Sequence, residues 1–345
     1  MSPTFPLLRL PLLAFENVVQ FVEFADLILL SQCSNKAERL VKQGTRALKH
    51  VKIDVSIGSS QSVVALVDGR REELTWTLID ENDYHVTEGN KGLILRIEGD
   101  KWKVLESASG WKTVHSDQID ALFSLIPHLK TLFFQISIRN LVLDEIGVNF
   151  KKLLVHTNHL HVAERIRTPT EAMYNHNIAY MLNTFITDNM EFNSTPSTLF
   201  KYSGPIRWSN VAIQNSHWID IEKLLEMMDS CKQIDLRLSS LKSVDLNRVL
   251  KYWLDSDSHL EKLQISVNQF AVEIREEKIL EGIRHVKGCK KRADSAEHFQ
   301  EKIKYEKGVD IVRKDGKVAT WLRMKDTVWS TFLFTVWQHP TPNLT

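Results

Sequence analysis

Residues 6 to about 48 show the hydrophobic spacing of short helices. Pro11 stands where the first turn of a helix tolerates proline. Apolar residues then recur at intervals of three and four, at Phe15, Val18, Val19 and Val22. Asp26 is placed to cap a second helix, and Ser34 a third that ends near Gly44. The pattern predicts a compact three-helix module over residues 1–48, small enough to gain stability by burial against a partner.

Between residues 51 and 115 the pattern changes to short β-forming runs separated by turn residues. The runs cover residues 51–57, 63–67, 74–79, 93–97 and 102–105. Asp68-Gly69 is a dipeptide typical of tight hairpin turns. These features predict an antiparallel β-rich segment over residues 49–116.

From residue 117 onward, helical patterns alternate with strand-like apolar runs. Helical patterns cover 117–126, 219–228 and 245–254, and the runs that follow them cover 128–134, 234–238 and 259–265. His128-Leu129 and His259-Leu260 open two of these runs with the same apolar positions, and 150–155 is a weaker copy. The spacing is near that of leucine-rich repeats, so the sequence predicts a degenerate αβ repeat-like domain over 117–345. The expected core positions are Leu132, Leu153, Leu236 and Leu263, with Trp253 packing onto the strand that follows its helix.

Two further elements are expected near the end of the chain. Residues 272–285 have an amphipathic helical pattern, and Asp315-Gly316 separates two strand-like runs that form a hairpin. The expected fold therefore combines α+β and α/β parts: a three-helix module, a β-rich segment, and an αβ repeat-like domain ending in a hairpin.

The composition narrows the possible functions. The 345 residues include 44 basic and 43 acidic side chains, and a formal net charge of +1 argues against a general nucleic-acid binder. No apolar stretch has the length of a membrane span. Cys33, Cys231 and Cys289 lie far apart, which favours reduced thiols in the cytoplasm or nucleus.

Candidate chemistry is sparse along the chain. Phosphate-binding, hydrolase and zinc-protease motifs are absent, so neither a catalytic residue nor a cofactor is expected. His156, His159 and His161 are the best metal candidates, but no cysteine or acidic cluster adjoins them. Hydrogen-bonded histidines on a surface strand are the favoured interpretation, and no metal site is expected. The basic run 287–292 is interpreted as a solvated loop.

The segment Pro6–Gln43 resembles the F-box. The matching features are Leu10-Pro11, Val18-Val19, Phe24-Ala25-Asp26-Leu27 and Leu29-Leu30-Ser31-Gln32-Cys33. Residues 5–11 look like the opening of the large nematode F-box families. The resemblance implies that the module binds a Skp-type adaptor on a cullin scaffold. We expect the adaptor-facing positions, or the core directly beneath them, to be Leu10, Pro11, Val18, Phe24 and Leu27.

Residues 219–265, and the later segment 311–320, look like the type 2 F-box-associated domain. Its marks here are the helix Asp245–Leu254 with Lys251 and Trp253, followed by a leucine-rich strand. Together the two resemblances imply the substrate-recognition subunit of a cullin-RING (SCF-type) ubiquitin ligase, which acts by bringing a protein substrate close to the charged conjugating enzyme. Outward positions of the strands, Arg237, Gln264 and Ser266, are the expected substrate contacts.

Two other functions remain open from the sequence. One is a solenoid interaction protein whose F-box-like start is vestigial and has no ligase role. The other is an enzyme without a short motif, which would require a convergent polar pocket between residues 51 and 340.

Overall fold

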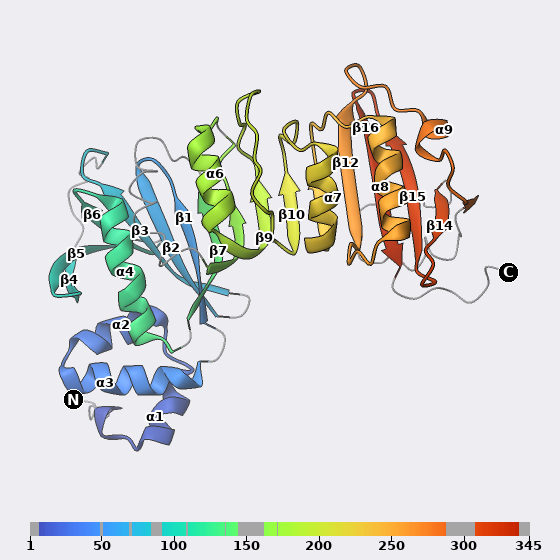
Figure 1. Ribbon diagram of the computed structural model, residues 1–345. Coiled ribbons are helices and arrows are strands. Elements are labelled where there is room, and N and C mark those ends of the chain that lie inside the picture. The colour runs from blue at the N-terminus through green and yellow to red at the C-terminus, as the bar shows by residue number, and fades with distance from the viewer. Residues whose placement is uncertain are drawn as a thin grey trace. The chain divides into compact units, whose positions relative to one another are not determined.

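The computed structural model describes residues 7–48, 51–68, 71–83, 92–107, 110–134, 136–143, 162–170, 172–287 and 308–337. The chain divides into two compact units, Met1–Pro169 and Thr170–Thr345 (Figure 1). The sequence pattern changes at residues 48 and 116, which predicts three domains. That division into three domains stays a prediction. The positions of 150–155, Leu153 and the three histidines 156, 159 and 161 lie outside the described residues.

The first unit begins with the three-helix module, residues 7–48. Its elements are η1 Leu7–Arg9, α1 Leu12–Val19, α2 Phe24–Gln32, α3 Asn35–Gly44 and η2 Thr45–Ala47. Ser34 caps α3 as expected, because its Oγ accepts a hydrogen bond from the Ala37 amide at 3.1 Å. The expected cap at Asp26 is wrong: α2 begins at Phe24 and Asp26 lies in its first turn, where a carboxylate favours the helix dipole.

The three helices pack around a small apolar core. The buried side chains are Phe15, Val19, Phe24, Leu27, Ile28, Ala37 and Val41. Gly44 permits the closest approach between α3 and α1, because a Cβ atom there would lie 2.7 Å from the Phe15 ring. The sequence pattern therefore predicts the helices of the module, and close packing at Gly44 determines how α1 and α3 contact each other.

A mixed sheet follows the module in the first unit. Its strands are β1 Val51–Ile57, β2 Gln61–Asp68, β3 Arg71–Asp80, β4 Gly92–Ile97, β5 Asp100–Ser107, β6 Gly110–His115, β7 Ser137–Leu143 and β8 Val162–Arg167. The order across the sheet is β4-β5-β6-β3-β2-β1-β7-β8. Within residues 51–115 the pairs β1–β2, β2–β3, β4–β5 and β5–β6 are antiparallel as expected, whereas β3–β6 is parallel. Beyond that segment β1–β7 and β7–β8 also pair in parallel. Parallel pairing is non-local, and the local pattern of residues 51–115 carried no sign of it.

Helix α4, Gln118–Leu132, packs on one face of this sheet (Figure 1). Its buried side chains include Leu122, Ile126, Leu129 and Leu132, which continue one helical stripe. The strand expected over 128–134 is therefore wrong, because the helix runs through Pro127 and carries the stripe to its end. Leu132 is buried as expected, but in a helix.

The second unit contains four parallel strands followed by antiparallel ones. Its elements are α6 Asn175–Thr184, β9 Ile186–Phe192, β10 Asn210–Ile213, α7 Ile221–Ser230, β11 Gln233–Leu236, α8 Ser243–Asp255, β12 Lys262–Asn268, α9 Glu276–Ile279, β13 Val286–Lys287, β14 Val309–Val312, β15 Val318–Lys325 and β16 Trp329–Trp337. β9 to β12 are parallel in sequence order, and β16, β15, β14 and β13 then follow in antiparallel pairs. The expected hairpin of β14 and β15 is present, whereas the helix expected over 272–285 is reduced to α9.

The strands of the second unit have a helix-covered face and an opposite polar face. Leu236 and Leu263 are fully buried, while Gln264 and Ser266 alternate with Leu263 along β12. Trp253 of α8 packs edge-to-face on Phe334 of β16, with ring centroids 5.2 Å apart. Its expected packing onto β12 stays a prediction. Residues 128–134 and 259–265 are not equivalent, because the first segment is largely helical; a repeat relationship among the later units stays a prediction.

Candidate protein-interaction surfaces

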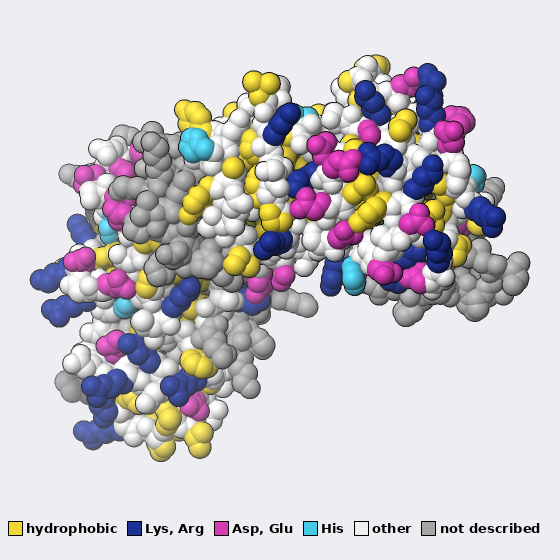
Figure 2. All heavy atoms as spheres, in the orientation of Figure 1, with side chains coloured by type: hydrophobic (Ala, Val, Ile, Leu, Met, Phe, Trp, Pro, Cys, Tyr) yellow, Lys and Arg dark blue, Asp and Glu magenta, His cyan; other side chains and the backbone are white. Residues whose placement is uncertain are grey.

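The helix α1 and the turn that ends it expose large apolar side chains to solvent. Leu13 is 75% exposed and Phe21 is 89% exposed, and Pro11 and Leu12 are exposed beside them. We call these four residues the apolar face of the three-helix module. Figure 2 shows hydrophobic side chains at the surface of the module with basic side chains nearby. Side chains of this kind on a folded surface typically mark a protein contact.

The five residues expected to meet an adaptor fall into two groups. Pro11 is exposed, and Leu10 and Val18 are half-buried, so these three reach the surface of the module. Phe24 and Leu27 are buried, and the Leu27 side chain has no exposed area. These two buried residues pack in the core of the module, so replacing them would affect adaptor binding only indirectly, through the stability of the module. The exposed pair Leu13 and Phe21 was missed, because an amphipathic pattern does not show which apolar side chains lack a packing partner.

The opposite side of the module is seated on the segment around the end of α4. The Phe24 ring meets the Phe133 ring edge-to-face, with centroids 5.3 Å apart. Thr45 Oγ1 donates a hydrogen bond of 2.7 Å to the Leu132 carbonyl oxygen. Arg46 lies over the Phe134 ring at 5.5 Å. These contacts combine apolar burial with a buried hydrogen bond, and they fix the module against the rest of the first unit.

A second contact joins the module to the sheet of the same unit. The Arg96 amide of β4 donates a hydrogen bond of 2.9 Å to Gln32 Oε1, at the end of α2. The edge of the sheet is thereby tied to the module at a point separate from the Phe24–Phe133 contact. The apolar face of the module consequently has a fixed orientation within the first unit.

The polar strand face of the second unit holds the expected substrate contacts Arg237, Gln264 and Ser266. Arg237 follows β11 and forms an ion pair with Asp235 at 3.2 Å, and it also donates to Gln214 Oε1 at 3.3 Å. Burial raises the pKa of Asp235, and the neighbouring Arg237 opposes that shift. The charge of Arg237 is therefore partly neutralised within the protein itself.

Ser266 also has a partner on this face. Its hydroxyl lies 3.0 Å from Thr331 Oγ1 on the adjacent strand β16. Gln264 pairs with Asp235 on one side and with Leu333 on the other in the register of the sheet. The three expected residues share one face, as the alternation predicted, but two of them already contact neighbouring side chains. Their role in substrate binding stays a prediction.

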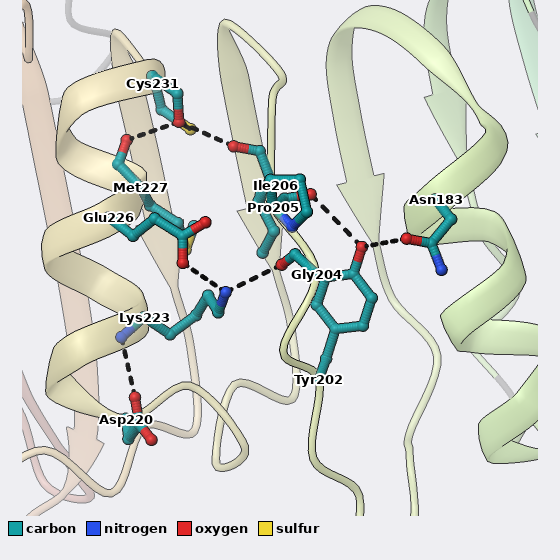
Figure 3. A network of polar contacts seen from close by, with 11 residues as sticks. Asn183, Tyr202, Gly204, Pro205, Ile206, Asp220, Lys223, Glu226, Met227 and Cys231 are labelled. Carbon is teal, nitrogen blue, oxygen red and sulfur yellow. Dashed lines mark hydrogen bonds and ion pairs between the residues drawn. The ribbon is translucent and has the colours of Figure 1, made fainter.

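A polar network anchors the helix-free connection between β9 and β10 (Figure 3). Lys223 of α7 is buried, and its ammonium donates to the Gly204 carbonyl oxygen at 2.9 Å and to Glu226 Oε2 at 2.5 Å. The same ammonium lies 5.7 Å from the centre of the Tyr202 ring. A buried lysine requires such partners, and here they hold the loop 193–209 against α7.

Tyr202 completes this network on the side of α6. Its hydroxyl donates a hydrogen bond of 2.9 Å to Asn183 Oδ1, and burial followed by the charge of Glu226 raises its pKa. A Cβ atom at Gly204 would lie 2.5 Å from the Tyr202 hydroxyl, so any other residue there would displace the Tyr202 ring. The network is a structural brace, since each of its polar groups is directed to another part of the same unit.

Candidate sites for metals and reactive thiols are few in the described part of the chain. No group of three or more metal-ligating side chains gathers among those residues. Burial raises the pKa of the Cys231 thiol to about 11, which keeps it protonated and unreactive at neutral pH. Cys33 is exposed, and Cys289 lies outside the described residues. None of the described helices combines the length and apolar character that a bilayer crossing needs.

Comparison with known proteins identifies the three-helix module. The family model of the F-box domain matches residues 7–45. No curated protein and no solved structure matches the chain. F-box domains generally bind Skp-type adaptors within SCF complexes. The resemblance to a type 2 F-box-associated domain gained no support and stays a prediction.

Proposed function

We propose that the chain recruits a protein substrate to a cullin-RING ubiquitin ligase by docking its F-box domain on a Skp-type adaptor. The observation that carries the proposal is the exposed apolar face of the module, borne by the domain that the F-box model matches. Apolar anchors of an interface commonly contribute about 2 kcal/mol or more each when they are buried by a partner. Leu13 and Phe21 are the two residues on this face with the most area to bury.

The proposed role requires no catalytic residue and no cofactor in this chain. The conjugating enzyme on the cullin scaffold carries the activated ubiquitin, and the F-box protein raises the local concentration of a substrate lysine near it. The fixed seat of the module on Phe133 and Leu132 suits this task, because a rigid connection limits the positions that a bound substrate can occupy. The proposal assigns the protein to the cytoplasm or nucleus, where such ligases act.

Co-purification of the full chain with a recombinant Skp-type adaptor and cullin tests the proposal. The double variant Leu13→Glu, Phe21→Glu places two charges in the proposed interface and should weaken adaptor binding at least tenfold. The matched control is Leu199→Glu, Phe270→Glu, two residues of comparable exposure in the second unit. The control should bind the adaptor like the unmodified chain.

Two results would overturn the proposal. One is unchanged adaptor binding by the Leu13, Phe21 variant, and the other is an equal loss in both double variants. If the unmodified chain itself does not bind the adaptor, the chain is better described as an interaction protein with a vestigial F-box. Leu27→Asp is unsuitable as a test, because it buries an unpaired charge in the core of the module and unfolds it.

A further inference from the structure

The loops that follow the parallel strands of the second unit are joined to one another by hydrogen bonds. Asn175, at the start of α6, donates to Ser197 Oγ at 2.8 Å in the loop after β9. The His217 ring, in the loop after β10, lies 3.4 Å from the Ser197 carbonyl oxygen. Ser240, in the loop after β11, donates to the His217 carbonyl oxygen at 3.3 Å. We call this row of loops the carboxyl edge of the second unit.

The same row continues to the loop after β12. The Arg275 amide donates a hydrogen bond of 2.8 Å to Ser243 Oγ at the start of α8. The brace around Lys223 and Tyr202 holds the loop after β9 against α7 (Figure 3). The carboxyl edge is thus a pre-organised surface, and loops in this position are where parallel αβ sheets commonly bind their ligands.

Large apolar side chains project into solvent all along the carboxyl edge. They are Tyr174, Leu199, Leu238, Val244 and Phe270, of which Leu199 is 86% and Phe270 79% exposed. Figure 2 shows hydrophobic side chains along this edge, separated by polar surface. At the opposite ends of the same four strands, Ile186 is the one large hydrophobic residue exposed among those the structure describes. The two edges therefore differ in a way that packing of the unit does not require.

A basic hollow lies at one end of this edge. It has a volume of about 290 Å³, and Lys242, Val244, Val272, Glu273, Arg275 and Lys278 are among its lining residues. Glu273 is the single acidic lining residue, and it pairs with Arg275 at 2.6 Å. Lys242 and Lys278 form no ion pair with the residues that the structure describes. Since both members of the Glu273–Arg275 pair are exposed to solvent, water screens their attraction, and a carboxylate from a partner can replace Glu273.

We propose that the carboxyl edge of the second unit binds an extended segment of a partner protein in which acidic residues adjoin bulky apolar residues. The cations of the hollow would receive the acidic residues, and the side chains of Val244 and Phe270 would cover the apolar ones. Single-file apolar side chains on separate loops fit an extended chain better than a flat protein surface. The polar strand face is the weaker candidate, since Arg237 and Ser266 already have internal partners.

The inference deepens the proposed function, because it names the surface and the chemical class of the substrate that the ligase would recruit. It does not depend on the F-box for its test. Adaptor binding and peptide binding are measured separately on the same protein preparation. A chain that binds the acidic-apolar peptide but not the adaptor refutes the ligase role alone, and the converse result refutes the carboxyl-edge inference alone.

The experiment measures fluorescence anisotropy of labelled synthetic peptides with the full chain. The probe peptide alternates Glu with Leu and Phe in a Gly-Ser background. A second peptide has Lys at every Glu, and a third has Ser at every Leu and Phe. We expect the first peptide to bind at least tenfold more tightly than the other two, with an affinity that falls as salt is added.

Variants locate the binding. Lys242→Glu with Lys278→Glu, and separately Phe270→Ser, should each weaken binding of the first peptide at least tenfold. Ile186→Ser and Lys314→Glu are the matched controls at the opposite edge, where both side chains are exposed, and they should leave binding unchanged. Thermal unfolding of every variant shows that the fold is kept. Absence of binding by the first peptide, equal binding of all three peptides, or equal loss in the controls would overturn the inference.

Discussion

The three-helix module and the carboxyl edge of the second unit both expose large apolar side chains, but they are built differently. On the three-helix module they belong to one short helix and its end, so that a single local segment carries the whole surface. On the second unit they are spread over loops far apart in sequence, from Tyr174 to Phe270, and cations lie among them. A concentrated apolar surface suits a lasting contact with a fixed subunit, whereas dispersed anchors with charges suit selective binding of a chain segment.

The supports beneath the two regions differ as well. The module is held by apolar packing of Phe24 on Phe133, in addition to the buried Thr45 hydrogen bond. The loops of the carboxyl edge are held by hydrogen bonds such as those of Asn175 and Ser240. Removing one large buried side chain lowers the stability of an apolar contact by several kcal/mol. Removing one of several separate hydrogen bonds has a smaller effect, because the other bonds remain.

The largest effect is expected from Phe133→Ala, at the seat of the module. Phe133 is 1% exposed, so the substitution removes a buried ring and should cost about 3–5 kcal/mol of unfolding free energy. Urea unfolding of the full chain measures it. The neighbouring Phe134→Ala is the matched control, because Phe134 is half exposed and contacts Arg46, a contact worth about 1 kcal/mol or less. Equal costs for the two rings would contradict the seat.

The contact of Phe24 with Phe133 also determines how the chain responds to truncation. Deleting residues 1–48 removes Phe24 and exposes Phe133, so the fragment 51–345 should be less stable than the full chain and more prone to associate. Adding Phe133→Ser to the fragment should restore solubility, measured by size-exclusion chromatography. A fragment that is monomeric without this change would show that the seat contributes little.

In the second unit, Leu263→Ala should cost about 2–5 kcal/mol, because its side chain is fully buried on the helix-covered face of β12. Arg237→Ala on the opposite face should change stability by about 0.5 kcal/mol or less, since its side chain is half exposed. Chemical unfolding of both variants compares the two faces. Similar losses would mean that the inside and outside assignment of these strands is wrong.

A smaller effect is expected at the brace of the loop 193–209. Lys223→Met keeps much of the side-chain length but removes the bonds to Gly204 and Glu226, at a cost of about 1–3 kcal/mol. Lys201→Met, at an exposed position of the same loop, serves as the control and should be nearly neutral. Hydrogen exchange of the loop separates the two: exchange should speed up only in the Lys223 variant. Equal exchange rates of the loop in the two variants would show that Lys223 does not hold it.

The smallest effect concerns the pH dependence of stability at His128 of α4. Burial lowers the pKa of His128 below its ordinary value of 6.5, while Glu38 raises it and Lys42 lowers it from α3. The folded state therefore disfavours the proton, so stability is full above the unfolded-state pKa and falls as pH drops below it. Unfolding free energies at neutral pH and at about pH 5.5 measure the slope. His128→Asn should flatten it, with part left by His115, whose pKa burial also lowers; an unchanged slope would contradict this role.

Structural features that depend on residues close together in the sequence were predictable. The cap at Ser34, the hairpin around Asp315-Gly316 and the alternation along β12 depend on residues within a few positions of each other. The helical pattern predicted from residue 117 ends at Ile126, whereas α4 continues through Pro127 to Leu132, because Leu129 and Leu132 are buried against the sheet. The parallel pairs of β1 with β7 and β3 with β6 join distant segments, and no local pattern shows them.

The interaction surface of the three-helix module was likewise predictable only in part. The F-box pattern located the module, but Leu13 and Leu27 are both leucines at helical positions and only packing distinguishes the exposed one from the buried one. The carboxyl edge was not predictable at all. Its loops come together because four parallel strands end at one side of the sheet, which brings Leu199 and Phe270 to the same edge.

Hydrogen exchange of the full chain with and without the Skp-type adaptor tests the central claim most directly. We predict that the adaptor slows exchange over residues 10–22, which include the apolar face, and leaves the carboxyl-edge residues 193–199, 214–218 and 237–243 unchanged. Unchanged exchange over 10–22 in the presence of saturating adaptor, or protection of the carboxyl-edge loops by it, would contradict the account.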